Sequence, residues 1–220
     1  MDERSIAIDS VYFAHHGDVS CDIQCRDKHA PVLVVLESPW HLEQFLQRPA
    51  TGRTGAILCS IFESVRGKLP SHFKELAPAF CTREVSIINV VDDYLPFKYG
   101  LKNKRMTAKE FIDSNSREYS DAMTKFKRKL EKSIDVSRVQ IVLLMGQLSW
   151  KTSNCFPSTS IVVELYHPSY VGRRSEFGDN VVMRTMLVAE YILYCLRHAS
   201  LSKGKFSIEQ FKDYIKKVKG

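Results

Sequence analysis

The feature that most constrains the fold of this chain is a set of four apolar runs, each followed by polar residues. The runs are five to seven residues long and occupy residues 32–36, 85–91, 139–145 and 161–165. Strands that read as nearly continuous apolar runs are typical of a parallel sheet covered on both faces. The sequence therefore predicts a central, mostly parallel sheet of four strands.

Segments with helical periodicity lie between these runs and after them. Residues 54–65 and 117–134 place apolar side chains on one face, and residues 181–196 are apolar nearly all round. Alternation of strands and helices is typical of α/β proteins. We therefore predict a three-layer α/β/α domain over residues 1–198. Residues 199–220 are predicted to form a basic amphipathic C-terminal helix.

Composition excludes several classes of protein. Of the 220 residues, 44% are hydrophobic and 26% are charged, which argues against wholesale disorder. Arg184 and Glu190 interrupt the longest apolar segment, so no membrane helix is expected. The acidic, polar N-terminus is unlike a signal peptide, and the six scattered cysteines are typical of reduced thiols. We expect a cytoplasmic monomer that does not bind membranes.

Positive charge is concentrated in two segments of a chain whose net charge is +7. Residues 98–132 hold 11 Lys and Arg against 5 Asp and Glu, and residues 197–220 hold 7 against 2. Either segment alone is consistent with a solvated helix face. Two such segments around an α/β core favour binding to the phosphates of a nucleic acid, with a strong dependence on salt.

Polar side chains follow three of the predicted strands. Glu37 and Ser38 follow the first, Asn89 ends the second, and His167 and Ser169 follow the fourth. In open parallel sheets, ligands bind beyond the carboxyl ends of the strands. These residues are therefore our candidates for the functional site.

Five short motifs carry these residues in order along the chain. They are LESPWH at residues 36–41, RPATGRTG at 48–55, INVV at 88–91, LMG at 144–146 and YHPSY at 166–170. Together they resemble the uracil-DNA glycosylase superfamily, in particular its thermostable bacterial and archaeal branch. The resemblance implies an enzyme that binds DNA, flips a nucleotide out of the duplex and cleaves its N-glycosidic bond.

The resemblance also implies roles for the residues at the strand ends. Glu37 would orient water and stabilise a cationic sugar, and His167 would donate a hydrogen bond to the charge that develops on the base. Asn89 would read a base edge. Ser38 stands where some branches carry a catalytic acid or Asn. Because a hydroxyl is a poor substitute for these groups, Glu37 would have to carry out the catalytic role. Structural interpretations remain open: Glu37 as a loop cap, Asn89 as a turn former, and His167 as a loop residue.

Two further residues are candidates for base binding, Trp40 and Ala50. An aromatic residue that stacks on the base stands at the position of Ala50 in the thermostable branch. Its absence predicts weaker activity, a different stacking residue such as Trp40, or a roomier pocket for a bulky modified base. Trp40 is equally consistent with core packing. Candidates for contact with DNA phosphates are Gly52, Arg53, Gly55, Ser169 and Arg173.

We expect no cofactor. The thermostable branch holds an iron–sulfur cluster through four cysteines, but Asp93 stands near one cluster position, and Cys21 and Cys25 have the wrong spacing for the usual pair. A zinc site formed by His16, Cys21, Cys25 and His29 is an alternative that the irregular spacing disfavours.

The leading hypothesis is therefore a monofunctional DNA glycosylase, since no Lys stands in a motif position to act as a Schiff-base nucleophile. It would remove uracil or a modified, bulky pyrimidine and leave an abasic site, in base-excision repair or in antiviral defence. A catalytically silent DNA-binding or base-sensing module on the same scaffold is the main alternative, favoured by Ser38 and Ala50. The basic segments disfavour a hydrolase of free nucleotides.

Overall fold

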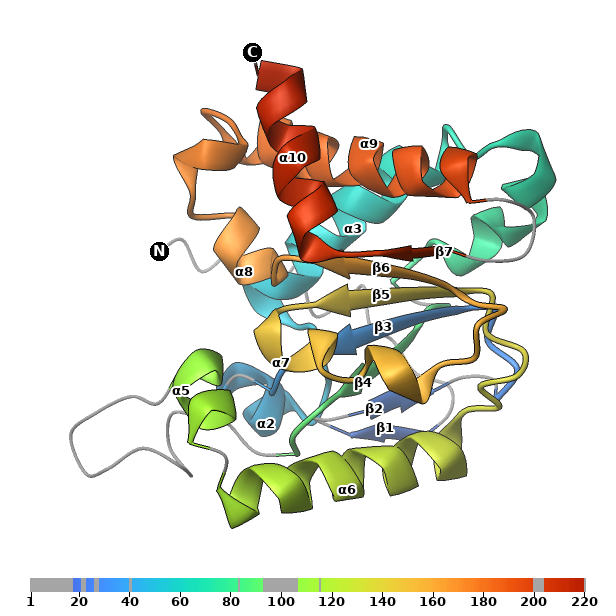
Figure 1. The fold of residues 1–220 in the computed structure, drawn as a ribbon. Helices are drawn as coiled ribbons and strands as arrows, with labels where there is room; N and C mark the ends of the chain where they lie inside the picture. The colour runs from blue at the N-terminus through green and yellow to red at the C-terminus, as the bar shows by residue number, and fades with distance from the viewer. Residues whose placement is uncertain are drawn as a thin grey trace.

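The computed structural model describes most of the chain as one α/β assembly (Figure 1). The described residues are 18–20, 23–25, 28–39, 41–82, 84–92, 107–114, 116–199 and 204–219. Among the helices in these ranges, none is long and apolar enough to cross a membrane.

The described strands form a single seven-stranded sheet with the order β1-β2-β4-β3-β5-β6-β7. In chain order they are β1 (Asp18–Ser20), β2 (Ile23–Cys25), β3 (Val32–Leu36), β4 (Ser86–Asn89), β5 (Ile141–Met145), β6 (Ile161–Leu165) and β7 (Gly204–Phe206). Strands β4, β3, β5, β6 and β7 pair in parallel in this order. The pairs β1–β2 and β2–β4 are antiparallel.

The prediction of a mostly parallel sheet is confirmed, but the prediction of four strands is wrong. The four apolar runs correspond to β3, β4, β5 and β6. The three strands that the sequence analysis missed are three residues long each. They lie at the two sides of the sheet, and three residues are too few to form an apolar run that a sequence pattern would reveal.

The central strands are buried on both faces. Along β3, Val32, Val34 and Leu36 belong to one apolar cluster, whereas Leu33 and Val35 belong to the other. Helices cover the two faces, as Figure 1 shows. On the first face these are α3 (Gly52–Arg66), α8 (Pro168–Val171), α9 (Val181–His198) and α10 (Ile208–Lys219), with the 3-10 helices η1 (Ser71–Ala79) and η3 (Ser175–Phe177). On the second face these are α5 (Ala108–Asp113), α6 (Arg117–Ser133) and α7 (Gln147–Trp150), with the 3-10 helix η2 (Ser153–Cys155).

The helices begin where the local sequence supplies a cap. Thr107 and Glu110 form a capping box at the start of α5, and the side chains of Ser116 and Asn180 accept backbone hydrogen bonds at the starts of α6 and α9. The three helical segments predicted from periodicity correspond to α3, α6 and α9. The three-layer α/β/α fold class is thus confirmed.

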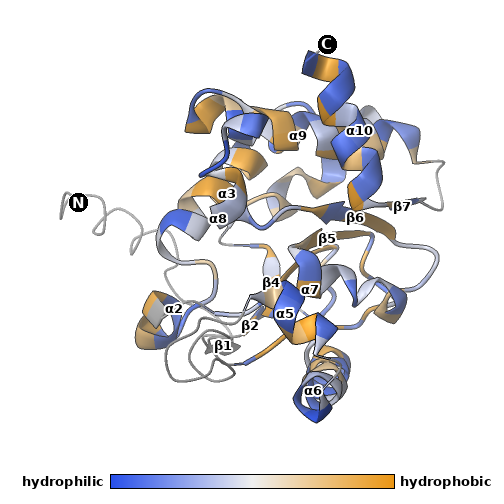
Figure 2. Cartoon of the chain, turned by 60° about the vertical axis from the view of Figure 1, so that its left-hand side comes forward, coloured by the Kyte–Doolittle hydropathy of each residue, from blue (hydrophilic) through white to orange (hydrophobic). Residues whose placement is uncertain are grey.

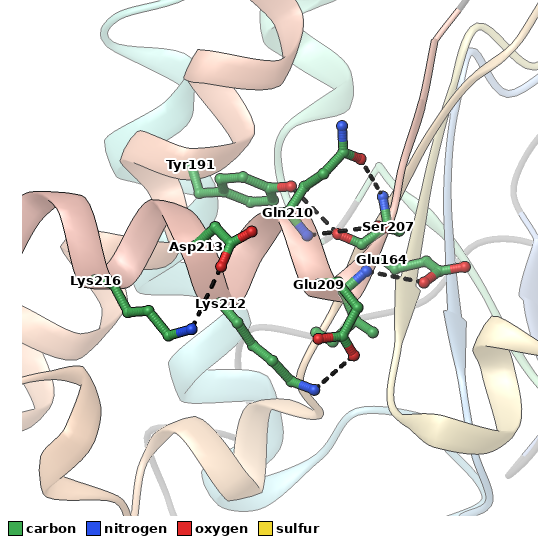
Figure 3. Close-up of polar contacts among 9 residues, drawn as sticks. Glu164, Tyr191, Ser207, Glu209, Gln210, Lys212, Asp213 and Lys216 are labelled. Atoms are coloured by element: carbon green, nitrogen blue, oxygen red, sulfur yellow. Dashed lines mark hydrogen bonds and ion pairs between the residues drawn. The ribbon is translucent and has the colours of Figure 1, made fainter.

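The C-terminal segment extends the sheet before it forms a helix. After β7, the backbone N–H of Ser207 donates to Gln210 Oε1 at 2.7 Å, and the N–H of Gln210 donates to Ser207 Oγ at 3.4 Å (Figure 3). The N–H of Ile208 donates to a carboxylate oxygen of Glu164 in β6 at 3.0 Å. With Phe211 fully buried, these contacts fix α10 against the sheet.

Candidate active site

Polar residues gather at the carboxyl edge of the parallel strands. The pairing register places Glu37 after β3, Gly146 after β5 and Tyr166 after β6 in one row across this edge. Asn89 is the last residue of β4, next to β3, and His167 lies one residue beyond the row. In Figure 2, the helices α2 (His41–Leu46), α5, α7 and α8 lie around the same edge.

The side chain of Glu37 lies over Gly146. A Cβ atom at position 146 would stand 2.4 Å from Glu37 Cδ, and Gly146 has a φ of 112°, which L side chains rarely adopt. The backbone N–H of Leu148 donates to Glu37 Oε1 at 3.1 Å. The carboxyl group therefore crosses from β3 toward β5, into the space that a side chain at position 146 would fill.

Burial raises the pKa of Glu37 to about 7, although the backbone hydrogen bonds from Leu148 and Gln147 act to lower it. Burial penalises the charged form, whereas hydrogen bonds donated to the carboxylate favour it. The group therefore changes its charge near neutral pH, which suits a residue that accepts a proton from water.

His167 is held as a neutral hydrogen-bond donor. Its Nδ1 atom accepts the backbone N–H of Ser169 at 3.3 Å and lies 2.8 Å from Ser169 Oγ. Burial lowers the pKa of His167 to about 4, and the nearby charge of Arg173 adds to this effect. Because Nδ1 accepts a hydrogen bond, the neutral ring carries its proton on Nε2. His167 can therefore donate an N–H at neutral pH without being charged.

The two groups stand on strands separated by β5, which corresponds to about 10 Å between strand axes. The carboxyl group of Glu37 covers part of this distance because it lies over Gly146. Asn89, on the other side of β3, is completely buried. The edge thus offers a carboxyl group with a pKa of about 7 and an uncharged N–H donor. When a bond breaks and one fragment leaves as an anion, the carboxylate can stabilise the cationic fragment and the N–H can donate to the anionic one.

Two arginines hold the loop that follows His167. Arg53 Nη2 and Arg184 Nη1 both donate to the carbonyl of Gly172, the latter at 2.9 Å. Arg184 also donates through Nε to Gly178 O at 2.7 Å and through Nη2 to Asp179 O at 3.2 Å. One guanidinium in α9 therefore fixes both ends of residues 172–179, and Arg53 connects the same loop to the first turn of α3.

We expect the substitution Arg184→Met to loosen this loop, because the carbonyls of Gly178 and Asp179 lose the donor from Arg184 and that of Gly172 keeps only Arg53. The amides of residues 172–179 should exchange with solvent about tenfold faster or more, as measured by hydrogen exchange with mass spectrometry. Arg197→Met, at an exposed position in the last turn of α9, is the control and should leave the loop unchanged. Equal exchange rates in the two variants would contradict the role of Arg184.

The remaining predicted residues occupy several places around the edge. Ser38 is partly buried directly after Glu37. Ala50 is completely buried in the apolar cluster under α3 and has a φ of 52°. Gly52 begins α3, and Gly55 is buried in its first turn. Arg173 is exposed, close enough to His167 to affect its pKa.

Some of the predicted residues cannot be placed. Trp40, Asp93, and His16 and Cys21 of the alternative zinc site lie outside the described residues. Within the described ranges, no cluster of three or more His, Cys, Asp or Glu side chains could hold a metal ion. Of the remaining two residues of that site, Cys25 Sγ lies 3.2 Å from Ser133 O, and His29 lies 3.4 Å from a carboxylate oxygen of Asp135.

The sequence analysis missed two features of the site. One is the role of Gly146, for which the only signal was a glycine directly after a strand. The other is Arg184, which was noted only as a charge within an apolar segment. Its three carbonyl partners lie 5 to 12 residues away along the chain. The signal for Arg184 was the charge itself, because a buried or half-buried charge needs partners.

A comparison with known protein families agrees with this arrangement. A model of the Uracil DNA glycosylase superfamily matches residues 24–187, which is more than half of the chain. The match runs from β2 into α9 and includes Glu37, Asn89, Gly146 and His167. No curated protein matches the chain. The matched family supports a DNA glycosylase-type function that acts on DNA. The chain therefore belongs to the uracil DNA glycosylase superfamily.

Proposed function

We propose that the protein is a monofunctional DNA glycosylase that flips out and excises uracil or a modified, bulky pyrimidine. The observation that carries this proposal is the pairing of Glu37, seated over Gly146, with the neutral His167 at one edge of the sheet. A carboxyl group and a neutral N–H donor are the groups that hydrolysis of an N-glycosidic bond needs.

In this mechanism the bond between the sugar C1′ and the base nitrogen breaks first, and both electrons leave with the base. His167 Nε2–H donates a hydrogen bond to the negative charge that develops on the base. The ionised Glu37 stabilises the cationic sugar and orients a water molecule. The water oxygen bonds to C1′, and its proton passes to Glu37. The base leaves as an anion that takes up a proton from solvent, Glu37 returns its proton to solvent, and the other product is an abasic site.

Other features of the chain support the finer parts of the proposal. No Lys stands in a motif position to attack C1′, so the DNA strand stays intact. The thermostable branch carries an aromatic residue at position 50, and the lack of that ring supports a bulky base as substrate, although Ala50 itself is completely buried under α3. Such a substrate would suit a role in defence against foreign DNA, and plain uracil would suit a role in repair.

The direct test is excision from labelled single-stranded and duplex oligonucleotides that carry uracil or a modified cytosine or uracil. Hot alkali then reveals abasic sites. We expect strand breaks only after alkali, and for some bases of the panel but not for others. Breaks without alkali would contradict a monofunctional mechanism, and uracil as the best substrate would exclude a preference for bulky bases.

We expect His167→Ala to lower the single-turnover rate of excision about 10²-fold, the usual effect of losing one donor to a developing anion. Binding of substrate DNA should change little, because the hydrogen bond strengthens only as the charge develops. His198→Ala, at an exposed position at the end of α9, is the matched control. An unchanged rate in His167→Ala would remove His167 from the mechanism.

A catalytically silent DNA-binding or base-sensing module is the second candidate, and Ser38 is the feature that favours it. In other branches a stronger catalytic side chain stands at this position. Tight, salt-dependent binding of the oligonucleotides with no abasic product from any member of the panel would support this alternative.

A further inference from the structure

Helix α10 begins at the same edge of the sheet as the candidate active site (Figure 1). Strand β7 pairs in parallel with β6, with Phe206 opposite Val163, so Ile208, the first residue of α10, is level with the end of β6. The strand before Glu37 and the strand before α10 are three spacings apart, about 14 Å, which is the length of about four base pairs. The family model matches residues 24–187, so α10 lies beyond the matched region.

One face of α10 is fixed to the core. Phe211 is completely buried, and the centroid of its ring lies 4.5 Å from that of Tyr191 and 5.9 Å from that of Tyr166. The ring of Tyr214 lies 5.2 Å from that of Tyr191. These contacts determine which side chains of α10 point to solvent.

Lysines recur along another face of the helix. Lys212, Lys216 and Lys219 are spaced by four and three residues, which places them on one side of α10, here called the α10 lysine face. Burial raises the pKa of Tyr166, and the positive charge of Lys212 is near enough to act against this rise. The α10 lysine face therefore starts beside Tyr166, the residue that precedes His167.

Two acidic side chains pair with these lysines. Lys212 Nζ lies 2.7 Å from Glu209 Oε1, and Lys216 Nζ lies 3.4 Å from Asp213 Oδ1 (Figure 3). Both pairs are exposed to solvent, where ion pairs are weak and can be replaced by contacts with an external anion. After Asp213 the helix carries three lysines and no acidic residue. The charge that α10 presents to solvent is therefore positive.

A further positive side chain lies near Tyr166. The ring of Tyr170 stacks on that of Tyr166 with the centroids 5.0 Å apart, and the guanidinium of Arg174 lies 4.8 Å from the centroid of Tyr170. The hydroxyl of Tyr170 donates to Glu176 at 3.1 Å, so one acidic side chain is present there as well. Positive side chains thus stand on both elements next to Tyr166, the loop of residues 172–179 and α10.

We propose that the α10 lysine face binds phosphates of duplex DNA on one side of the flipped nucleotide. The inference rests on the proposed function, because it assumes that a nucleotide leaves the duplex at the edge that holds Glu37 and His167. A row of positive charges that starts at this edge and runs away from it complements the DNA backbone, which carries one negative charge per about 1.7 Å of duplex. Phosphate contacts carry no sequence information, so α10 positions the duplex and does not select the base.

The first experiment does not depend on excision. It measures the affinity for a duplex with a central tetrahydrofuran abasic analogue at several salt concentrations. The test variant replaces the three residues of the α10 lysine face with Gln. Because each phosphate contact contributes about 0.9 to the slope of log affinity against log salt, this slope should become smaller by about two to three. At low salt, the affinity should fall about tenfold or more.

A control variant loses the same charge at the opposite end of α3 and in η1. It carries the exposed-site substitutions Arg66→Gln, Lys68→Gln and Lys74→Gln. Its salt slope should change by less than about one. Asp213→Asn removes an acidic partner of the α10 lysine face and should instead raise the affinity about twofold.

Shortening the duplex locates the contact. With fewer than about four base pairs left on one side of the analogue, the wild type should bind about tenfold more weakly. The test variant should lose little on that side, because its contacts there are already absent, and effects that share one contact are not additive. Shortening the other side should weaken the wild type and the test variant equally.

Three results would overturn the proposal: an unchanged salt slope in the test variant, an equal decrease in the control variant, or equal sensitivity of wild type and test variant to shortening on each side. A wild type that excises no base, but whose affinity depends on the α10 lysine face, would contradict the proposed function and uphold this inference. Excision by the wild type together with an unchanged slope in the test variant would do the reverse.

Discussion

Replacing Glu37 with Gln is expected to lower the single-turnover rate of base excision about 10³-fold, in the range found for groups that act as general bases. Gln can still accept the N–H of Leu148 and fill the space over Gly146, but it cannot take a proton or carry a negative charge opposite a cationic sugar. The measurement is excision of the best base of the oligonucleotide panel with enzyme in excess. Glu75→Gln, at an exposed position in η1, is the control.

The pH dependence of the rate should identify the same group. Because the pKa of Glu37 is raised to about 7, the ionised form becomes scarcer by a factor of ten for each pH unit below that value. The wild-type rate should therefore rise with pH and level off above about pH 7. His167 has a pKa of about 4 and stays neutral above pH 5, so its titration does not change the rate above pH 5. The residual rate of Glu37→Gln should not show the rise.

The raised pKa of Glu37 also has a consequence for stability. A carboxyl group that binds its proton more tightly in the folded state stabilises the fold at low pH. This contribution is lost as pH rises from 4.5 through about 7. The side chain of Gln does not titrate, so its contribution to stability does not change with pH. Between pH 4 and pH 8, the free energy of unfolding of Glu37→Gln should therefore gain about 3 kcal/mol relative to the wild type. Urea titrations at both pH values measure this difference. A constant difference would contradict the raised pKa.

How much of the fold could be predicted depends on how a strand is covered. Residues 32–36 face apolar clusters on both sides of the sheet, so their sequence is apolar throughout and marks β3 clearly. The three residues of β7 are exposed or half-buried, and they follow no apolar alternation that would distinguish them from a loop. Pairing with β6 makes them a strand, and that is a long-range contact that no local pattern records.

The same distinction applies to the site. Glu37, Asn89 and His167 could be placed together from the sequence, because parallel strands bring their carboxyl ends to one edge. The position of the Glu37 side chain over Gly146 could not be predicted from the sequence, since it depends on the register between β3 and β5.

The second large effect is expected from the smallest change, Gly146→Ala. Its added methyl group would stand 2.4 Å from Glu37 Cδ, and the φ of 112° is strained for any residue with a Cβ. We expect the carboxyl group to be displaced and to lose its hydrogen bond from Leu148. The excision rate should then fall almost as far as in Glu37→Gln, about 10³-fold. Gly67→Ala, at the C-cap of α3, is the matched control, because its Cβ would meet nothing closer than 3.7 Å.

The double variant separates displacement of Glu37 from general damage to the fold. If Gly146→Ala acts through Glu37, adding it to Glu37→Gln should lower the rate little further, because the group that it displaces is already inactive. Residues that act as one unit show this non-additivity, whereas independent defects multiply their effects on the rate. A further 10³-fold loss in the double variant would mean that Gly146 acts by a different route. An unaffected single variant would mean that Glu37 does not need its seat over the glycine.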